Sequence, residues 1–243
     1  DGVLVRTVSA GSFEAVTRRL GILHALRRLE IPVWNDAAAI ERCVDKSMTT
    51  FLLQQAGVPV PASWAVEGLA AAERIVQAEV SAGPLVLKPL FGSQGRGLKQ
   101  IRAVADLPPP EEVGGVYYLQ RFVPGAGPTF HDFRIFVIEG EPVAAMARHG
   151  STWITNVKQG GRPVCVSLDR ELAALAAASA QAVGARFCGV DVVRGADGAA
   201  AVLEVNSMPA WSGLQSVASI DIAAALAEAF CRAVRAETGV RAA

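Results

Sequence analysis

GVDVVRGADGAAAVLEVN, at residues 189–206, carries the clearest structural signal in the chain. Apolar residues alternate with polar ones on both sides of Asp197-Gly198, a dipeptide that favours the tight turn of a β-hairpin. Equal steps outward from this turn place Asp191 opposite Glu204, and the period of two puts Asn206 on the same face. The sequence therefore predicts a hairpin with oxygen-bearing side chains gathered on one face.

These three side chains predict a metal site. Two carboxylates that face each other across a strand pair repel, so a compensating cation is expected between them. Oxygen ligands without histidine or cysteine favour Mg²⁺ or Mn²⁺. The alternative is an ordinary hairpin with an acidic solvent face, and the apolar residues that flank both carboxylates argue against it.

A second signal lies upstream, where glycines follow an apolar strand. The sequence FGSQGRG at residues 91–97 contains glycines that let backbone N–H groups approach phosphate oxygens. No Lys-Ser or Lys-Thr pair follows, and a strand is expected next, so the segment is neither a Walker loop nor a dinucleotide fingerprint. We therefore expect a hairpin flap that covers a nucleotide.

Two lysines stand near this flap in the predicted fold. Lys88 lies in the apolar strand 85–89, where an ammonium group is costly to bury unless an anion meets it. We expect a phosphate there, against the alternative of an edge-strand lysine that reaches solvent. Lys46 follows Asp45, a candidate helix cap, and is expected either to reach the same phosphates or to be solvated in the first helical turn.

Composition excludes several classes of protein. The chain has 243 residues, 51% of them hydrophobic, and its 23 basic residues equal its 23 acidic ones, so no basic field exists to hold nucleic acid. No apolar run reaches the roughly 20 residues that span a bilayer. The four scattered cysteines form no CxxC motif and indicate buried free thiols in a reducing compartment. We expect a cytoplasmic protein without a membrane or nucleic-acid partner.

The remaining periodicities predict an α/β (α+β) protein. An antiparallel arrangement is expected from Tyr117 onward, with a tight turn at Glu139-Gly140. The chain begins without Met inside an apparent strand–helix–strand unit, so preceding sequence is expected to be missing. Besides the hairpin, strands are expected at about 3–8, 31–35, 85–89, 97–102, 117–122, 133–139 and 142–148, and helices at about 12–28, 46–56, 68–80, 169–183 and 220–236.

Seven collinear segments resemble the RimK-like branch of the ATP-grasp superfamily. They are Asp45-Lys46, LVLKP at 85–89, GSQGRG at 92–97, LQRFV at 119–123, HDFRIFV at 131–137, CGVDVVR at 188–194 and LEVNSMP at 203–209. The chain looks nearest to the glutamate ligases that act on tetrahydromethanopterin-type and methanofuran-type one-carbon carriers. The resemblance implies two α/β lobes that grip ATP, a small lobe at 45–118 with the flap and a large lobe at 119–243 with the metal site. Residues 1–44 would be the C-terminal part of a preceding α/β domain.

The resemblance also implies roles for individual residues. Asp191, Glu204 and Asn206 would hold two Mg²⁺ or Mn²⁺ ions. Arg134 and Ser207 would bind substrate, and Arg148, Asn156 and Lys158 would take part in catalysis. ATP would be bound by Lys46, Lys88, Gly92, Ser93, Gln94, Gly95, Gly97, Gln120, Arg121, Phe122, Val123 and Asp132.

Three positions depart from the pattern of the family. Related ligases have an arginine where this chain has Ile154, so Arg148 or Lys158 would have to neutralise the γ-phosphate. Arg121 occupies a hinge position that is commonly acidic, and 208–210 reads Met-Pro-Ala in place of small-Pro-Gly. Trp153 and Trp211 lie near the presumed acceptor segments and are candidates for stacking on an aromatic acceptor, with a core position as the alternative.

The activity implied by the resemblance is ATP-dependent joining of a carboxylate to an amine. L-glutamate would be added to a carboxylated acceptor, either a pterin or furan one-carbon carrier or a peptide, through an acyl phosphate, with ADP and phosphate as products. A homo-oligomer is expected from the habit of the family. The alternatives are an ATP-binding scaffold or sensor without ligase chemistry, for which Ile154 is the best argument, and a kinase with the same fold.

Overall fold

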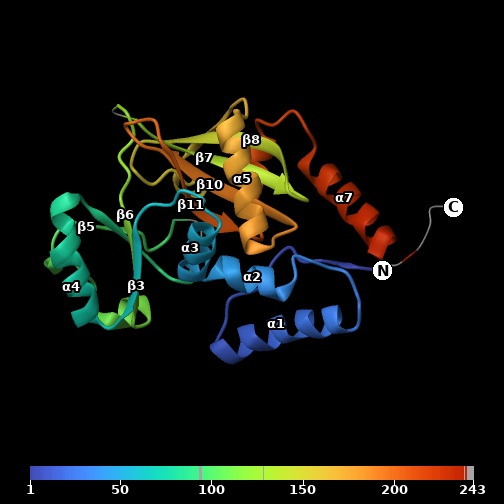
Figure 1. Cartoon of the computed structure of the whole chain (residues 1–243), viewed down its shortest axis with the longest axis horizontal. Coiled ribbons are helices and arrows are strands. Elements are labelled where there is room, and N and C mark those ends of the chain that lie inside the picture. The colour runs from blue at the N-terminus through green and yellow to red at the C-terminus, as the bar shows by residue number, and fades with distance from the viewer. Residues whose placement is uncertain (93–94, 128, 238, 240–243) are drawn as a thin grey trace.

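The computed structural model describes residues 1–92, 95–127, 129–237 and 239, and in this part of the chain it contains two antiparallel sheets (Figure 1). The larger sheet has the strand order β11-β10-β7-β8-β9. The β7–β8 turn has positive φ at both Glu139 and Gly140, as a type I′ turn requires, which confirms the predicted hairpin. The strands are β7 (Phe130–Ile138), β8 (Glu141–Gly150), β9 (Arg162–Cys165), β10 (Phe187–Arg194) and β11 (Ala200–Asn206).

Helices cover both faces of the larger sheet. On one face, α5 (Arg170–Val183) packs its apolar side against a buried cluster that includes Ile135. On the other, α7 (Ile222–Glu237) packs against a cluster that includes Phe136. Consecutive residues of a strand point to opposite faces, so these clusters lie on opposite sides of the sheet.

The smaller sheet, at the left of Figure 1, has the order β3-β6-β4-β5. One face is covered by α4 (Leu69–Glu79) through Ala72 and Val76. Leu85, Leu87, Ile101, Tyr117 and Leu119 point to this helix, so the alternating residues Val86, Lys88, Tyr118 and Gln120 occupy the opposite face. The strands are β3 (Ser63–Glu67), β4 (Leu85–Lys88), β5 (Lys99–Ile101) and β6 (Val116–Arg121).

The N-terminal residues form a strand–helix–strand unit, as predicted. β1 (Val3–Leu4) pairs in parallel with β2 (Val33–Trp34), and α1 (Phe13–Arg28) connects them. Two helices follow, α2 (Ala37–Val44) and α3 (Lys46–Gln55), and the side chain of Asp45 caps α3. α3 contacts α5 and β11 on one side and β3 on the other, so it packs between the two sheets. Short helical turns complete the chain at α6 (Ser212–Gln215), Val80–Ala82, Val104–Asp106, Pro110–Val113 and Val157–Gln159.

Asn35 ties this N-terminal unit to the larger sheet. Its side chain is fully buried, and its Nδ2 donates to the carbonyl oxygens of Phe187 and Ser207, each at 2.7 Å. Its Oδ1 accepts from the backbone N–H groups of Arg186 and Phe187 at 2.6 and 3.3 Å. One amide therefore satisfies backbone groups at the start of β10 and just after the end of β11, where these two strands are not paired with each other.

The structure corrects several predicted elements. The strand expected at 3–8 is only β1, because β2, its sole partner among the described residues, is two residues long. β3, β9 and α2 were not predicted. The two strands are short and lack a clear apolar period, and α2 is amphipathic but only eight residues long, which is too short for periodicity alone to identify a helix. The other helices and strands are present, with ends that differ by a few residues.

The compositional expectations have mixed outcomes. All four cysteines are free, but Cys165 and Cys231 are exposed, which contradicts the expectation of buried thiols. Burial raises the pKa of the Cys43 thiol to about 12. Within the described residues, no helix combines the length and the apolar character that crossing a bilayer requires.

Replacing Asn35 with alanine should lower the free energy of unfolding by about 3 kcal/mol, because buried backbone donors and acceptors lose their partners. Urea unfolding followed by circular dichroism measures this loss. Gln54→Ala, on the exposed side of α3, serves as the matched control and should change stability by less than about 0.5 kcal/mol. Equal urea midpoints for both variants would contradict the role given to Asn35.

Candidate functional site

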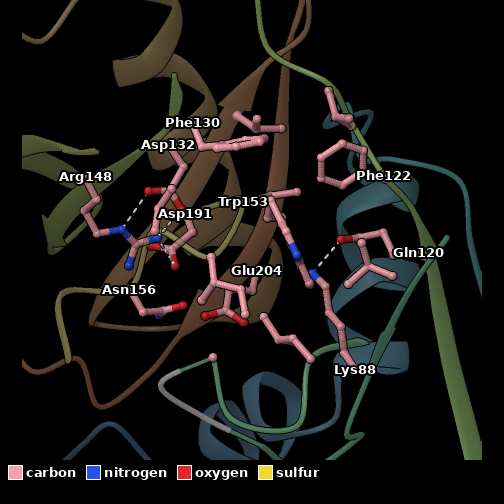
Figure 2. Close-up of a pocket in the computed structure, with 18 of the residues that line it drawn as sticks. Lys88, Gln120, Phe122, Phe130, Asp132, Arg148, Trp153, Asn156, Asp191 and Glu204 are labelled. Carbon is pink, nitrogen blue, oxygen red and sulfur yellow. Dashed lines mark hydrogen bonds and ion pairs between the residues drawn. The ribbon is translucent and has the colours of Figure 1, made fainter. Parts of the chain in front are cut away.

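A pocket lies between the two sheets (Figure 2). The smaller sheet contributes Lys88 and Gln120 from the face opposite α4, and the larger sheet contributes Asp132, Asp191 and Glu204. The glycine-rich segment that follows β4 and the loop that follows β8 complete the lining. Residues far apart in the sequence are thus brought together, most of them among those that the sequence singled out.

The hairpin of β10 and β11 forms as predicted, and Asp191 lies opposite Glu204. The steps from the turn are not equal, however, because Val192 pairs with Val202 and the register then shifts by one residue. This shift is a β-bulge in β11. Without it, Leu203 would lie opposite Asp191; with it, Leu203 and Glu204 both line the pocket.

Asp191 is held by two arginines. Arg134 Nε and Nη2 donate to its two carboxylate oxygens at 2.7 Å each, and Arg148 Nη2 donates to Oδ2 at 2.9 Å. Arg148 also forms a bidentate pair with Asp132, visible in Figure 2. Three of these residues, Asp132, Arg148 and Asp191, are almost completely buried.

Their partners favour the charged forms of Asp191 and Arg148. Burial alone would raise the pKa of Asp191, but Arg134 and Arg148 hold it well below the ordinary value. Burial would likewise lower the pKa of Arg148, but Asp191 and Asp132 raise it. The cluster therefore presents fixed, paired charges at the base of the pocket.

Glu204 is the more open carboxylate. Its side chain is 31% exposed, and Arg134 Nη2 approaches it only to 4.0 Å. No three His, Cys, Asp or Glu side chains gather as a metal site among the described residues, so the proposed ligand set depends on the amide oxygen of Asn206. That oxygen accepts from the N–H of Met208 at 3.0 Å and retains a second lone pair. Two carboxylates and an amide suit Mg²⁺, and Glu204 keeps oxygen atoms toward the pocket.

Lys88 is buried in the interior of the smaller sheet. β4 pairs with both β5 and β6, which contradicts the alternative of an edge-strand lysine. The ammonium group donates to Gln120 Oε1 at 2.6 Å, so its partner is a neutral amide (Figure 2). Burial, partly opposed by Glu204, lowers its pKa to about 8.

Lys46 is also buried, which contradicts the alternative of a solvated side chain. Its Nζ donates to the carbonyl oxygens of Leu90 and Gly92 at 3.3 and 2.9 Å. Burial lowers its pKa, and Glu204 opposes that effect. Lys46 thus joins the start of α3 to the start of the glycine-rich segment.

The glycine-rich segment approaches the loop after β8. Gly92 and Gly95 line the pocket, whereas Ser93 and Gln94 lie outside the described residues. Gly95 has φ +70°, and a Cβ atom there would collide with Oδ1 of Asn156. The positive φ favours glycine here, and a Cβ atom would also require the Asn156 side chain to shift.

The predicted hinge residues Gln120, Arg121, Phe122 and Val123 all line the pocket. Arg121 donates to Glu79 at 2.7 Å and to the carbonyl of Gly83 at 2.6 Å, which anchors it to the smaller sheet. Phe122 meets Trp153 edge to face, with ring centroids 6.1 Å apart. Trp211 instead packs against Phe136 in the core. A core position was the alternative to stacking on an acceptor.

Several predicted site residues are separate from the pocket wall. The described residues that line the pocket include Asp132, Arg148 and Asn156. They do not include Gly97, Arg134, Lys158, Asn206 or Ser207. Ser207 is buried, and its carbonyl accepts from Asn35. Lys158 lies on the helical turn Val157–Gln159, beyond Asn156.

Some residues at the pocket were not predicted. Arg96, Phe130 and Leu203 line it, and the pairing of Arg134 with Asp191 was not expected. The alternation of β11 indicates that Leu203 faces away from Glu204, and only the bulge brings both to one surface. Arg96 lies within GSQGRG, and the glycines of this segment predicted contacts to phosphate through backbone N–H groups, not through a side chain.

Known proteins are similar to this chain over most of its length. A model of the RimK-like ATP-grasp domain matches residues 43–230. The tetrahydromethanopterin:alpha-L-glutamate ligase of Methanococcus maripaludis is 33% identical over 199 residues, covering 79% of this chain and 67% of the relative. A probable alpha-L-glutamate ligase of Legionella pneumophila is 31% identical, covering 89% and 75%.

Solved structures show the same fold. The ATP-grasp ligase PsnB, in complex with a minimal precursor, aligns with a TM-score of 0.68 at 25% identity, over 92% of this chain and 70% of PsnB. D-cycloserine synthetase DcsG aligns with a TM-score of 0.68 at 22% identity, over 91% and 80%. The fold expected from the seven segments is confirmed, and the chain belongs to the RimK-like ATP-grasp family of ligases.

Proposed function

We propose that this chain joins L-glutamate to a carboxylated acceptor, with conversion of ATP to ADP and phosphate. The observation that carries the proposal is one pocket in which Lys46 and Lys88 face Asp191 and Glu204. Its glutamate ligase relatives support L-glutamate as the amine. The acceptor would be a pterin or furan one-carbon carrier, or a peptide.

We propose that two Mg²⁺ or Mn²⁺ ions would be held by Asp191, Glu204 and Asn206. Bound there, the ions would offset the negative charge of the β- and γ-phosphates. Lys46 and Lys88 contribute positive charge from the opposite side of the pocket. Gln120 to Val123 are proposed to border the adenine.

The first chemical step is attack by an acceptor carboxylate oxygen on the γ-phosphorus of ATP. The bond from that phosphorus to the bridging oxygen breaks, and ADP leaves with the electron pair. The fixed cations and backbone N–H groups of Gly92 and Gly95 are proposed to stabilise the charge that spreads over the transferred group. The product is an acyl phosphate.

In the second step, the glutamate amine attacks the acyl carbon, phosphate leaves and the nitrogen loses a proton. The acyl phosphate must be protected from water until the amine arrives. We propose that the glycine-rich segment supplies this protection, since it already contacts the loop of Asn156. Arg134 and Ser207 are proposed to assist substrate binding indirectly, because both support the strands that bear the site.

We propose a division of the chain at residues 44 and 118. Residues 45–118 would form the small lobe and 119–243 the large lobe, after a segment of the preceding domain at 1–44. The separate apolar core of the smaller sheet, built around Leu85 and Tyr117, supports two lobes. α3 packs between them, so the boundary at 44 separates chain segments rather than independent cores.

The proposal predicts that ADP release requires Mg²⁺, L-glutamate and the acceptor together. A panel of pterin, furan and peptide carboxylates, with mass spectrometry of the acceptor, measures it; a gain of glutamyl units is expected. ADP release without the amine would favour a kinase. Nucleotide binding without turnover on any acceptor would favour a scaffold or sensor.

Replacing Glu204 with glutamine should lower turnover by at least about a hundredfold, because a neutral amide offsets cationic charge less well than a carboxylate. Steady-state ADP release measures the effect. Glu228→Gln, on the exposed side of α7, is the matched control and should retain activity. Similar rates for the two variants would contradict the role of Glu204.

Affinity for Mg²⁺·ADP should fall as the pH rises through 8, because Lys88, with a pKa of about 8, loses its charge there. Between pH 7 and 9 the charged fraction falls about tenfold, and the association constant should follow it. Isothermal titration calorimetry measures this dependence. Lys88→Met should remove it, and Lys99→Met, on the exposed edge of β5, should retain it. A pH-independent affinity in the unmodified protein would contradict this role.

A further inference from the structure

Five lysine and arginine side chains are among the described residues that line the pocket, and four of them have partners within the protein. Lys46 is bound to backbone carbonyls, Lys88 to Gln120, Arg121 to Glu79, and Arg148 to two aspartates. The fifth, Arg96, is exposed and forms no hydrogen bond or ion pair with any residue that the structure describes. An arginine that lines an anion-binding pocket without a partner is available to a ligand.

Arg96 follows a glycine that lies close to the loop after β8. Gly95 lies so close to Asn156 that a Cβ atom would clash with the amide oxygen. Arg96 therefore projects from backbone that abuts the loop after β8. Ile154, two residues before Asn156, lines the same pocket.

The resemblance to RimK-like ligases predicts an arginine at the position of Ile154, and an isoleucine attracts no anion. Of the two substitutes predicted from the sequence, neither is an unpaired side chain that lines the pocket. Arg148 is buried and its charge is already shared by Asp132 and Asp191. Lys158 is not among the described residues that line the pocket.

We propose that Arg96 supplies the guanidinium group that binds the terminal phosphate of the nucleotide, in place of the one absent at Ile154. This inference rests on the proposed function for its catalytic meaning, but the contact itself concerns nucleotide binding alone. A planar guanidinium group donates two parallel hydrogen bonds to phosphate oxygens. Because Arg96 is solvated and unpaired, binding does not have to break an existing ion pair.

Calorimetric titration with Mg²⁺·AMPPNP and with Mg²⁺·ADP tests the contact. Arg96→Ala should bind Mg²⁺·AMPPNP about tenfold more weakly, with less than a twofold change for Mg²⁺·ADP, since only the former has a third phosphate. Arg96→Lys should restore part of the affinity. Arg102→Ala, an exposed arginine outside the pocket, is the matched control and should bind both nucleotides normally.

A rescue variant tests the replacement. Ile154→Arg introduced into Arg96→Ala should recover most of the lost AMPPNP affinity, and it should recover the kcat of ADP release while the KM for the amine stays unchanged. Equal losses for both nucleotides, no loss in Arg96→Ala, or no recovery by Ile154→Arg would overturn the inference. Absence of amine-dependent turnover in the unmodified protein would overturn the proposed function instead, and the binding comparison would still decide the role of Arg96.

Discussion

The pairing of Asp191 with two arginines is the interaction on which the rest of the site depends. Asp191, Asp132 and Arg148 are nearly inaccessible to water, so each needs a counter-charge to stay ionised. Removing Arg148 would leave the buried carboxylate of Asp132 uncompensated, at a cost of about 3–5 kcal/mol. Because the four charged groups come from β7, β8 and β10, their hydrogen bonds also fix three neighbouring strands relative to one another.

The two sheets present opposite charges to the space between them. Lys88 comes from the smaller sheet and Lys46 from the helix that packs beside it, whereas the larger sheet presents Glu204 and the arginine-bound aspartates. A metal–triphosphate complex has negative and positive parts, so a pocket with divided charge is complementary to it. The partner of Lys88 is only an amide, and an anionic ligand would find its charge uncommitted.

The sequence predicts much of this arrangement, and the misses have physical causes. The pairing of Asp191 with Glu204 was predicted from equal steps about the turn, but in the structure it results from the bulge, which adds one residue to β11. The bulge does not follow, because nothing in the apolar pattern marks where an extra residue enters β11. Arg134 and Arg148 became partners of Asp191 through the order of strands, a long-range property. β3 and β9 escaped prediction because their side chains are mostly half-exposed and show no clear alternation.

The bulge in β11 also has an evolutionary consequence. It is one residue that separates a hairpin with Glu204 in the pocket from an equally well-paired hairpin with Leu203 in its place. Deletion of Leu203 would remove the bulge, leave Val192 opposite Val202, and keep Asp191 opposite Glu204. The loss of one codon therefore need not disturb the sheet when it falls at the bulge, which is the place where this hairpin can change length while its two carboxylates stay paired.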